Sequence, residues 1–289
     1  MPGPGKPDVT AYYDEPTGTL TYLVVDPGSN RAAIVDPVLD YDEKAGRVTT
    51  QSADTLLADI QKRDLKVDWI LDTHPHADHL TALAYLKDKL GAPTAIGEKV
   101  VELQKLWRTI YNVSDFPIDG KQWDRLFRNG DNFTIGDLPV RVMYSPGHTL
   151  ASITYVIGDS VFMHDTLFQP DSGSARCDFP GADAAQLYQS ISAILALPDD
   201  TRLFTGHDYR PGGRSAQWQS TVAEQKRDNI HFKSKPSCDE FVRMRQARDR
   251  TLAMPKQILH ALQVNLRAGA LPPAESDGRH YLKIPLNRL

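Results

Sequence analysis

The chain has 289 residues, of which 40% are hydrophobic and 24% are charged. This length and composition fit one large α/β domain, with or without an extension. We find no stretch long and apolar enough to span a bilayer, and the net charge of -4 gives no basic field for nucleic acid. We therefore expect a cytoplasmic enzyme that binds neither membranes nor nucleic acid. The only cysteines, Cys177 and Cys238, lack the spacing of a disulfide framework or a zinc ribbon.

The first half of the chain alternates between strand and helix patterns. Its first ten residues are rich in proline and glycine and predict a loose tail. A hairpin, a helix that Ser52 could cap, a buried strand and a helix closed by Gly91 are expected next. Their ranges are 19–26 with 32–37, 52–63, 67–74 and 80–91.

The second half predicts a meander of strands followed by helices. Tight turns at Gly136-Asp137 and Gly158-Asp159 separate the strand candidates. The predicted strands are 132–137, 139–148, 152–158 and 160–165. A helix near 183–197, a strand at 201–208 and a mainly helical tail from about 219 to 270, interrupted by Pro255, complete the pattern.

The run THPHADHL at residues 73–80 places several metal-ligand types where a strand gives way to a helix. In an extended loop His74 and His76 project to one side, while Asp78 and His79 turn into the following helix. Imidazole and carboxylate groups are the ordinary protein ligands of zinc and iron. These donors can therefore converge on one metal centre.

Three further candidates stand at comparable places. His148 in SPGHT, Asp165 in HDTLF and His207 in GHDY each follow an apolar strand. The ends of neighbouring strands share one edge of a sheet, where sites in α/β proteins usually form. We expect them beside the histidine run, whereas His231, His260 and His280 are assigned to ordinary surface or core positions.

These motifs, in this order, resemble the metallo-β-lactamase superfamily, whose signature is HxHxDH followed by a distant His, Asp and His. The resemblance implies an α/β (α+β) fold, the four-layer αββα sandwich, with a metal site at the edge of its two sheets. For two metals it implies a first site of His74, His76 and His148, with Asp165 shared. Asp78, His79 and His207 would form the second. We expect residues 1–235 to form this catalytic domain and 236–289 to form a helical C-terminal extension packed on it.

The longer stretches SPGHTLASITYVIGD, HDTLFQPDSGSARCDFPG and TGHDYRPGGR are similar to persulfide dioxygenases of the bacterial type related to β-lactamase-hydrolase-like proteins. That resemblance implies one Fe(II) per chain, held by His74, His148 and Asp165. The remaining donors would orient these ligands: His76, Asp78, His79 and His207. Two imidazoles and one carboxylate form a facial triad that leaves positions open for substrate and dioxygen.

The ligand types for two metals are all present, so a glyoxalase-II-like dinuclear thioester hydrolase stays open as the alternative. A non-catalytic sensor of glutathione or persulfide is a weaker third hypothesis.

For the dioxygenase we expect glutathione persulfide and O2 as substrates, with sulfite and glutathione as products. Tyr209, Arg210, Arg214 and Arg176 are the candidate substrate-binding residues, because arginine pairs bidentately with carboxylates. Lys226 and Arg227 are expected to be solvated, and Cys177 partly buried. A homo-oligomer and a sulfurtransferase partner are both compatible with the sequence.

Overall fold

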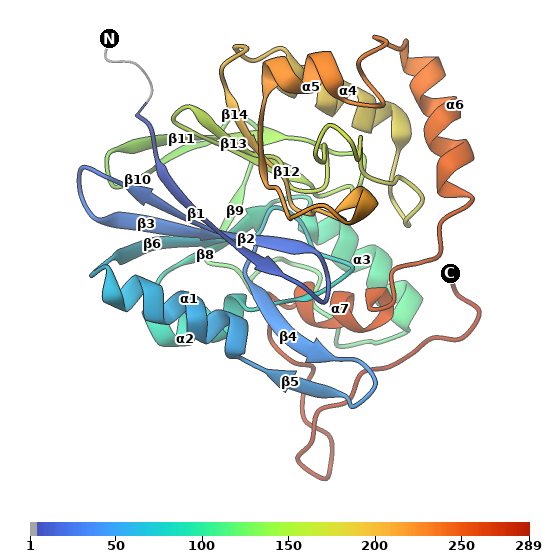
Figure 1. Cartoon of the computed structure of the whole chain (residues 1–289). Coiled ribbons are helices and arrows are strands. Elements are labelled where there is room, and N and C mark those ends of the chain that lie inside the picture. The colour runs from blue at the N-terminus through green and yellow to red at the C-terminus, as the bar shows by residue number, and fades with distance from the viewer. Residues whose placement is uncertain (1–4) are drawn as a thin grey trace.

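The computed structural model describes residues 5–289 and is built around two six-stranded sheets (Figure 1). The first sheet has the order β1 (Asp8–Asp14), β2 (Thr19–Asp26), β3 (Arg31–Val35), β6 (Lys66–Leu71), β8 (Thr94–Gly97) and β9 (Arg125–Phe127). The second has the order β10 (Asn132–Ile135), β11 (Leu138–Tyr144), β12 (Ile153–Ile157), β13 (Ser160–Phe162), β14 (Arg202–Phe204) and β15 (Gln219–Thr221). A small third sheet contains β5 (Arg47–Thr49), β4 (Val38–Asp42) and β7 (Leu80–Thr81).

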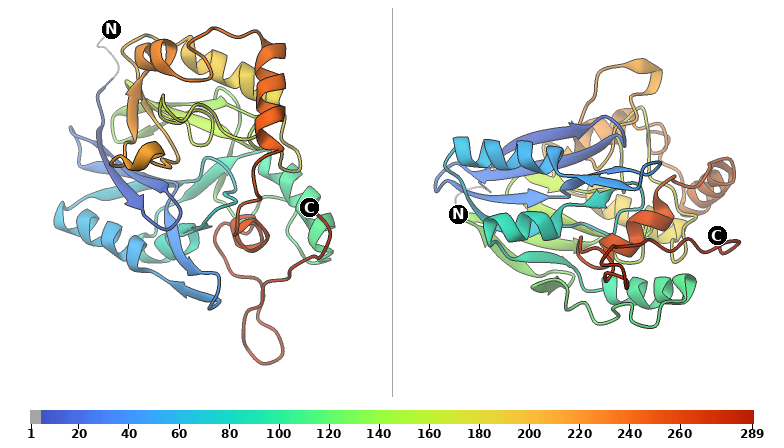
Figure 2. Two further views of the ribbon diagram at one scale, coloured as in Figure 1. Left: turned by 45° about the vertical axis from the view of Figure 1, so that its right-hand side comes forward. Right: turned by 90° about the horizontal axis from the view of Figure 1, so that it is seen from below.

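Helices cover the outer faces of both large sheets (Figures 1 and 2). The first sheet is covered by α1 (Gln51–Lys62), α2 (Leu83–Leu90), α3 (Val100–Tyr111) and α7 (Ile258–Asn265). The second is covered by α4 (Ala184–Leu195), α5 (Val222–Asp228) and α6 (Cys238–Asp249). This arrangement confirms the four-layer αββα sandwich.

The central core lies between the two sheets and follows the two-residue period of a strand. On β2, Leu20, Tyr22 and Val24 face the second sheet, whereas Leu23 and Val25 pack against the helices of the first layer. Because both faces of β2 are covered, all eight of its residues are buried. This double burial explains the nearly continuous apolar run in its sequence.

Several predicted elements are confirmed. β2 and β3 form the expected antiparallel hairpin, and β10 to β13 form the expected meander. Gly91 closes α2 in the left-handed conformation with φ 64°. Residues near Pro255 separate α6 from α7, as the proline predicted.

Other expectations were wrong in detail. The N-terminal tail was predicted to be loose, but residues 8–10 belong to β1, which pairs with β2; residues 1–4 lie outside the described part. Ser52 is not the cap of α1. It lies inside the helix, where its hydroxyl and amide donate to Asp40 of β4 at 2.6 and 2.9 Å. The strands predicted at 67–74 and 201–208 end earlier, at Leu71 and Phe204.

The sequence did not predict the elements between residues 92 and 131, although α3 carries a helical apolar stripe. Val100, Leu103, Trp107 and Tyr111 are buried on one face of α3. The chain after α7, residues 266–289, has neither a regular helix nor a strand and forms a projecting loop (Figure 2). Among residues 5–289 no helix is long and apolar enough to cross a membrane.

Candidate metal centre

The predicted ligands meet at one edge of the paired sheets, each in a loop that follows a strand. His74 to His79 follow β6, His148 follows β11, Asp165 follows β13 and His207 follows β14. Two separate groupings of donor atoms include Asp165, and the atoms of each group lie within 4.8 Å of one another. The structure thus brings together strands from both sheets, as the motif order predicted.

The first group is His74, His148 and Asp165, whose side chains are all buried. The Thr73 hydroxyl donates to Asp36 at 2.8 Å and therefore accepts from His74 Nδ1 at 3.1 Å. His148 Nδ1 donates to the Arg176 carbonyl at 2.9 Å. Both imidazoles thus have Nε2 as the free lone pair, and His74 Nε2 is buried without any partner. A buried nitrogen without a hydrogen-bond partner fits a metal ligand.

A second set of donors lies beside the first. His76, Asp78 and His79 form one group, and Asp78, Asp165 and His207 form another. His207 lies between two carboxylates, with Nδ1 at 2.6 Å from Asp165 and Nε2 at 2.7 Å from Asp78. Nδ1 of His76 and Nε2 of His79 are buried without partners. The fold therefore keeps the donors for a second metal close together.

The protonation of the first group suits metal binding, which needs neutral imidazoles and an ionised carboxylate. Burial lowers the pKa of His74 far below its usual range, and burial also lowers that of His148. Burial opposes ionisation of Asp165, but the adjacent His207 outweighs it and lowers the pKa of that carboxyl to about 2. Two neutral nitrogens and one anionic oxygen are thus presented together.

Asp36 orients this centre, although no motif in the sequence predicted it. It follows β3 in the left-handed conformation with φ 52° and is 3% exposed. Its carboxylate accepts the Thr73 amide at 2.7 Å and His76 Nε2 at 3.1 Å. Partners of metal ligands fix ring orientation in this way. The local signal was an aspartate just after an apolar strand, the same context as Asp165.

His164 was also missed, although it precedes Asp165 in the HDTLF motif. Its Nε2 lies 3.1 Å from both Ser145 Oγ and Thr166 Oγ1, and its ring centroid lies 4.9 Å from that of His74. Burial lowers its pKa to about 3, so the ring is neutral. The neutral His164 ring packs against the His74 ring.

A cavity of about 950 Å³ opens over the metal centre. Asp78, His148 and Asp165 contribute to its wall, together with aromatic side chains and cations. The aromatic residues are Tyr41, Phe168, Phe179 and Tyr209, and the cations are Lys44, Arg176, Arg245, Arg248 and Lys256. Of these cations, only Arg176 was among the predicted substrate residues. Asp42, Glu43 and Asp171 also line the cavity, so its wall combines apolar surface with charges of both signs.

The predicted substrate residues divide into two pairs. Arg176 and Tyr209 line the cavity, and the Tyr209 ring stacks on His207 at 5.5 Å. Arg214 lies in an ion-pair network with Asp171 and Asp208, and Arg210 pairs with Glu15. Neither Arg210 nor Arg214 is part of the cavity wall, so their contact with substrate stays a prediction.

Lys226, Arg227 and Cys177 lie in the surroundings that were expected for them. Lys226 and Arg227 form exposed pairs with Asp199 and Asp228. Cys177 is partly buried.

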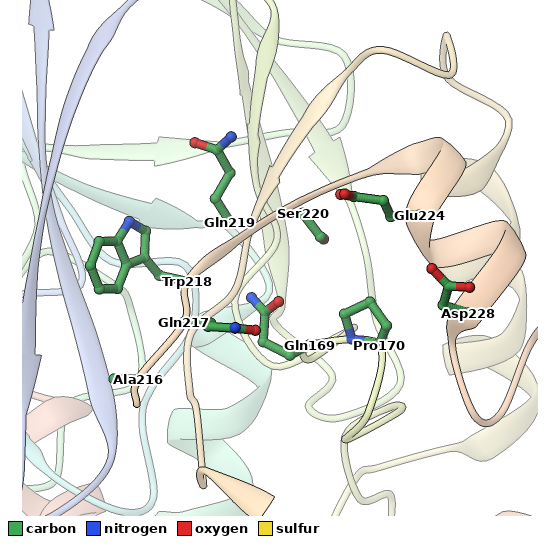
Figure 3. A pocket seen from close by; sticks show the side chains of 9 residues that line it. All are labelled: Gln169, Pro170, Ala216, Gln217, Trp218, Gln219, Ser220, Glu224 and Asp228. Carbon is green, nitrogen blue, oxygen red and sulfur yellow. The ribbon is translucent and has the colours of Figure 1, made fainter. Parts of the chain in front are cut away.

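A second hollow of about 490 Å³ lies over α5 and the segment before it (Figure 3). Trp218 and Gln219 lie on one side of it, and Glu224 and Asp228 on the other (Figure 3). Glu224 is already engaged in the capping box of α5, and Asp228 pairs with Arg227. The acidic groups of this hollow thus already have partners. The metal centre opens into the cavity of about 950 Å³ and not into this hollow.

Gly206 marks a position where the backbone approaches the metal ligands too closely for a side chain. A Cβ at this residue would lie 2.7 Å from Asp165 Oδ1. We expect Gly206→Ala to displace this carboxylate and to weaken metal binding by about 10- to 100-fold, the range for disturbed ligand positioning. Metal titration of the purified variant checks this. Gly28→Ala is the matched control, because its Cβ would meet Asp26 only at an ordinary 3.5 Å.

Comparison with known proteins identifies the family to which this fold belongs. Residues 14–207 match the sequence profile of the Metallo-beta-lactamase superfamily. A beta-lactamase hydrolase-like protein of Agrobacterium fabrum is 59% identical over 283 residues, which are 98% of this chain and 65% of that protein. The chain thus spans just under two thirds of that relative.

Two further relatives match nearly end to end. Glyoxylase B2 of Dictyostelium discoideum is 46% identical over 292 residues, 100% of this chain and 99% of that protein. Human mitochondrial persulfide dioxygenase ETHE1 is 30% identical over 278 residues, 94% of this chain and 92% of that protein.

Among solved structures, ETHE1 from Myxococcus xanthus superposes with a TM-score of 0.73 at 30% identity, covering 91% of this chain and 100% of that chain. The fold, the ordered ligand motifs and the matched profile lead to one conclusion. The chain belongs to the metallo-β-lactamase superfamily.

Proposed function

We propose that this protein is a persulfide dioxygenase that converts glutathione persulfide, O2 and water to glutathione and sulfite. The observation that carries the proposal is the buried triad of His74, His148 and Asp165, of which His148 and Asp165 line a large cavity. The likeness to human persulfide dioxygenase over 94% of the chain supports it.

The triad fits Fe(II) by the chemistry of its donors, two imidazoles and one carboxylate. Fe(II), when bound, would supply the redox chemistry with dioxygen, which no side chain can supply. The chain's own contribution is to hold the three donors within reach of one ion, with His148 and Asp165 in the cavity wall. The Arg176 carbonyl and the Thr73 hydroxyl keep both imidazoles in the tautomer that exposes Nε2.

The cavity wall would hold the rest of the substrate. Glutathione persulfide carries two carboxylates, and Arg248 and Lys256 place positive charge on the wall, whereas the Arg176 guanidinium is already paired with Asp178. Phe168 and Phe179 present apolar surface beside the ligands, and the Phe179 ring lies 5.2 Å from that of His148. These rings would exclude water from the persulfide sulfur, while the cations fix the peptide.

A second candidate function is thioester hydrolysis at two metals. It is favoured by the closeness of Asp78, His79 and His207 to the first group, and by the glyoxylase name of one relative. Two metals about 4 Å apart can bridge and activate one water molecule. The two functions differ in metal content and in the need for oxygen.

His79→Ala separates the two functions. If His79 only orients the loop, the variant keeps about one iron per chain and loses about 10- to 100-fold in activity. If His79 binds a second metal, the variant loses one of two metals and nearly all hydrolysis. Elemental analysis, oxygen uptake with glutathione persulfide, and hydrolysis of S-lactoylglutathione are measured together.

The exposed His280 provides the matched histidine control for this comparison. Two metals per wild-type chain without oxygen uptake would contradict the dioxygenase proposal.

A further inference from the structure

The side chain of Asn265 connects α7 to the loop that carries the histidine run. Asn265 is the last residue of α7 and is 1% exposed. Its amide Nδ2 donates to the carbonyl oxygens of His76 and His79, both at 2.8 Å, and its Oδ1 accepts from the Thr81 amide at 2.8 Å. One buried side chain therefore makes two hydrogen bonds to the metal-ligand loop and a third to Thr81 of β7, directly after the loop.

These contacts join segments far apart in the sequence. The residues bonded to Asn265 lie 184 to 189 positions earlier in the chain. The packing at this junction is tight, because a Cβ at Gly269 would lie 2.8 Å from the Thr81 carbonyl oxygen. The end of α7 therefore lies directly against the start of α2.

The hydrogen bonds from Asn265 act on backbone that no strand holds in place. Residues 74–79 lie between β6 and β7, outside both strands, so the sheet ladder does not fix their carbonyl groups. The Asn265 amide group binds the carbonyl oxygens of both His76 and His79. These two hydrogen bonds fix the backbone on either side of Asp78. A metal ion would then find these donors already arranged, with less conformational entropy to lose on binding.

We propose that Asn265 is a positioning residue of the metal centre, through which the C-terminal helix α7 raises metal affinity. The inference rests on the metal centre of the proposed function and is independent of persulfide oxidation. It is tested by metal binding alone, so its failure and the failure of the proposed function are distinguishable.

The test is a titration of Co²⁺ into metal-free protein, followed by the visible absorption of the bound ion. In Asn265→Asp the retained Oδ1 still accepts from Thr81, but an oxygen replaces the nitrogen that donates to two carbonyls. We expect the Co²⁺ dissociation constant to rise by about 10- to 100-fold, with an altered absorption spectrum. Wild-type affinity and spectrum in this variant would overturn the proposal.

Gln263→Glu is the matched control on the same helix. Gln263 is 4% exposed, its Nε2 donates to Leu259 and Lys283 carbonyls at 2.7 and 2.9 Å, and its Oε1 accepts from the Lys283 amide at 2.8 Å. The chemical change is the same, but these contacts are made within α7 and to the terminal segment instead of the metal loop. An equal loss of affinity in both variants would indicate general loosening of α7 and would overturn the proposal.

If Asn265→Asp does not fold, Asn265→Ala replaces it in the same titration, because it adds no buried charge. Wild-type affinity in that variant overturns the proposal, and a loss of about tenfold or more supports it. If neither variant folds while Gln263→Glu does, Asn265 serves folding as a whole, which also overturns the proposal.

Discussion

Replacing Asp165 with alanine is expected to remove the metal and the activity together. Asp165 is the only carboxylate in the first donor group, and its Oδ1 also accepts from His207 at 2.6 Å. Without it, the first donor group keeps two neutral imidazoles and has no anionic donor. We expect activity to fall by more than about 100-fold, beyond the loss typical of residues that only orient a ligand.

Elemental analysis and oxygen uptake, made on the same preparation of Asp165→Ala, check this expectation. Asp199→Ala is the control, because Asp199 forms only an exposed ion pair with Lys226. A variant that keeps one iron per chain and a tenth or more of the wild-type rate would sink the assignment of Asp165 as an iron ligand. Loss of iron without loss of hydrolysis would favour the alternative chemistry.

The histidine run could be placed from sequence because its information is local. His74, His76, Asp78 and His79 follow a strand within one short stretch, and strand ends share an edge of a sheet. The same rule placed the donors after β11, β13 and β14. The meander was equally readable, because apolar alternation and glycine turns are properties of adjacent residues.

What the sequence could not give were the partners of charged side chains. Arg214 follows the metal motif and was predicted to bind substrate, but Asp171, 43 residues earlier, accepts two of its hydrogen bonds. Asp208, 6 residues earlier, accepts two more. A sequence pattern shows that an arginine could pair with a carboxylate. It does not show whether that carboxylate belongs to the substrate or to another residue of the protein. Only the fold decides that.

The strand β1 was missed for a different reason. Its residues DVTAYYD are typical of a strand, but the preceding prolines and glycines indicated a loose end. The deciding factor is pairing, since residues 8–14 lie in antiparallel register with residues 19–25 of β2. Tertiary pairing thus outweighs a neighbouring composition that favours a coil.

Asp249→Ala is expected to cause the largest loss of stability. Arg245 and Asp249 of α6 are 2% and 5% exposed, and the Asp249 carboxylate accepts from the Arg245 guanidinium at 2.6 and 3.0 Å and from the Cys177 amide at 2.9 Å. Removing it leaves the buried guanidinium without its counter-ion and the Cys177 amide without an acceptor. Breaking a buried pair in this way costs about 3–5 kcal/mol in the free energy of unfolding.

Urea unfolding followed by circular dichroism measures this change. Asp199→Ala should cost less than about 1 kcal/mol, because its pair with Lys226 is exposed and screened by solvent. The double variant Arg245→Met with Asp249→Leu should recover most of the loss, since it removes the buried charge from both sides.

The buried pair also acts on the metal centre through one backbone segment. Arg245 donates to the Ser174 carbonyl at 3.0 Å, and Asp249 accepts the Cys177 amide, so α6 holds both ends of the residues that include Arg176. The Arg176 carbonyl in turn fixes the tautomer of His148. If the double variant regains stability but binds metal more weakly than wild type, the pair positions that carbonyl in addition to stabilising the fold. Full metal affinity in the double variant would restrict its role to stability.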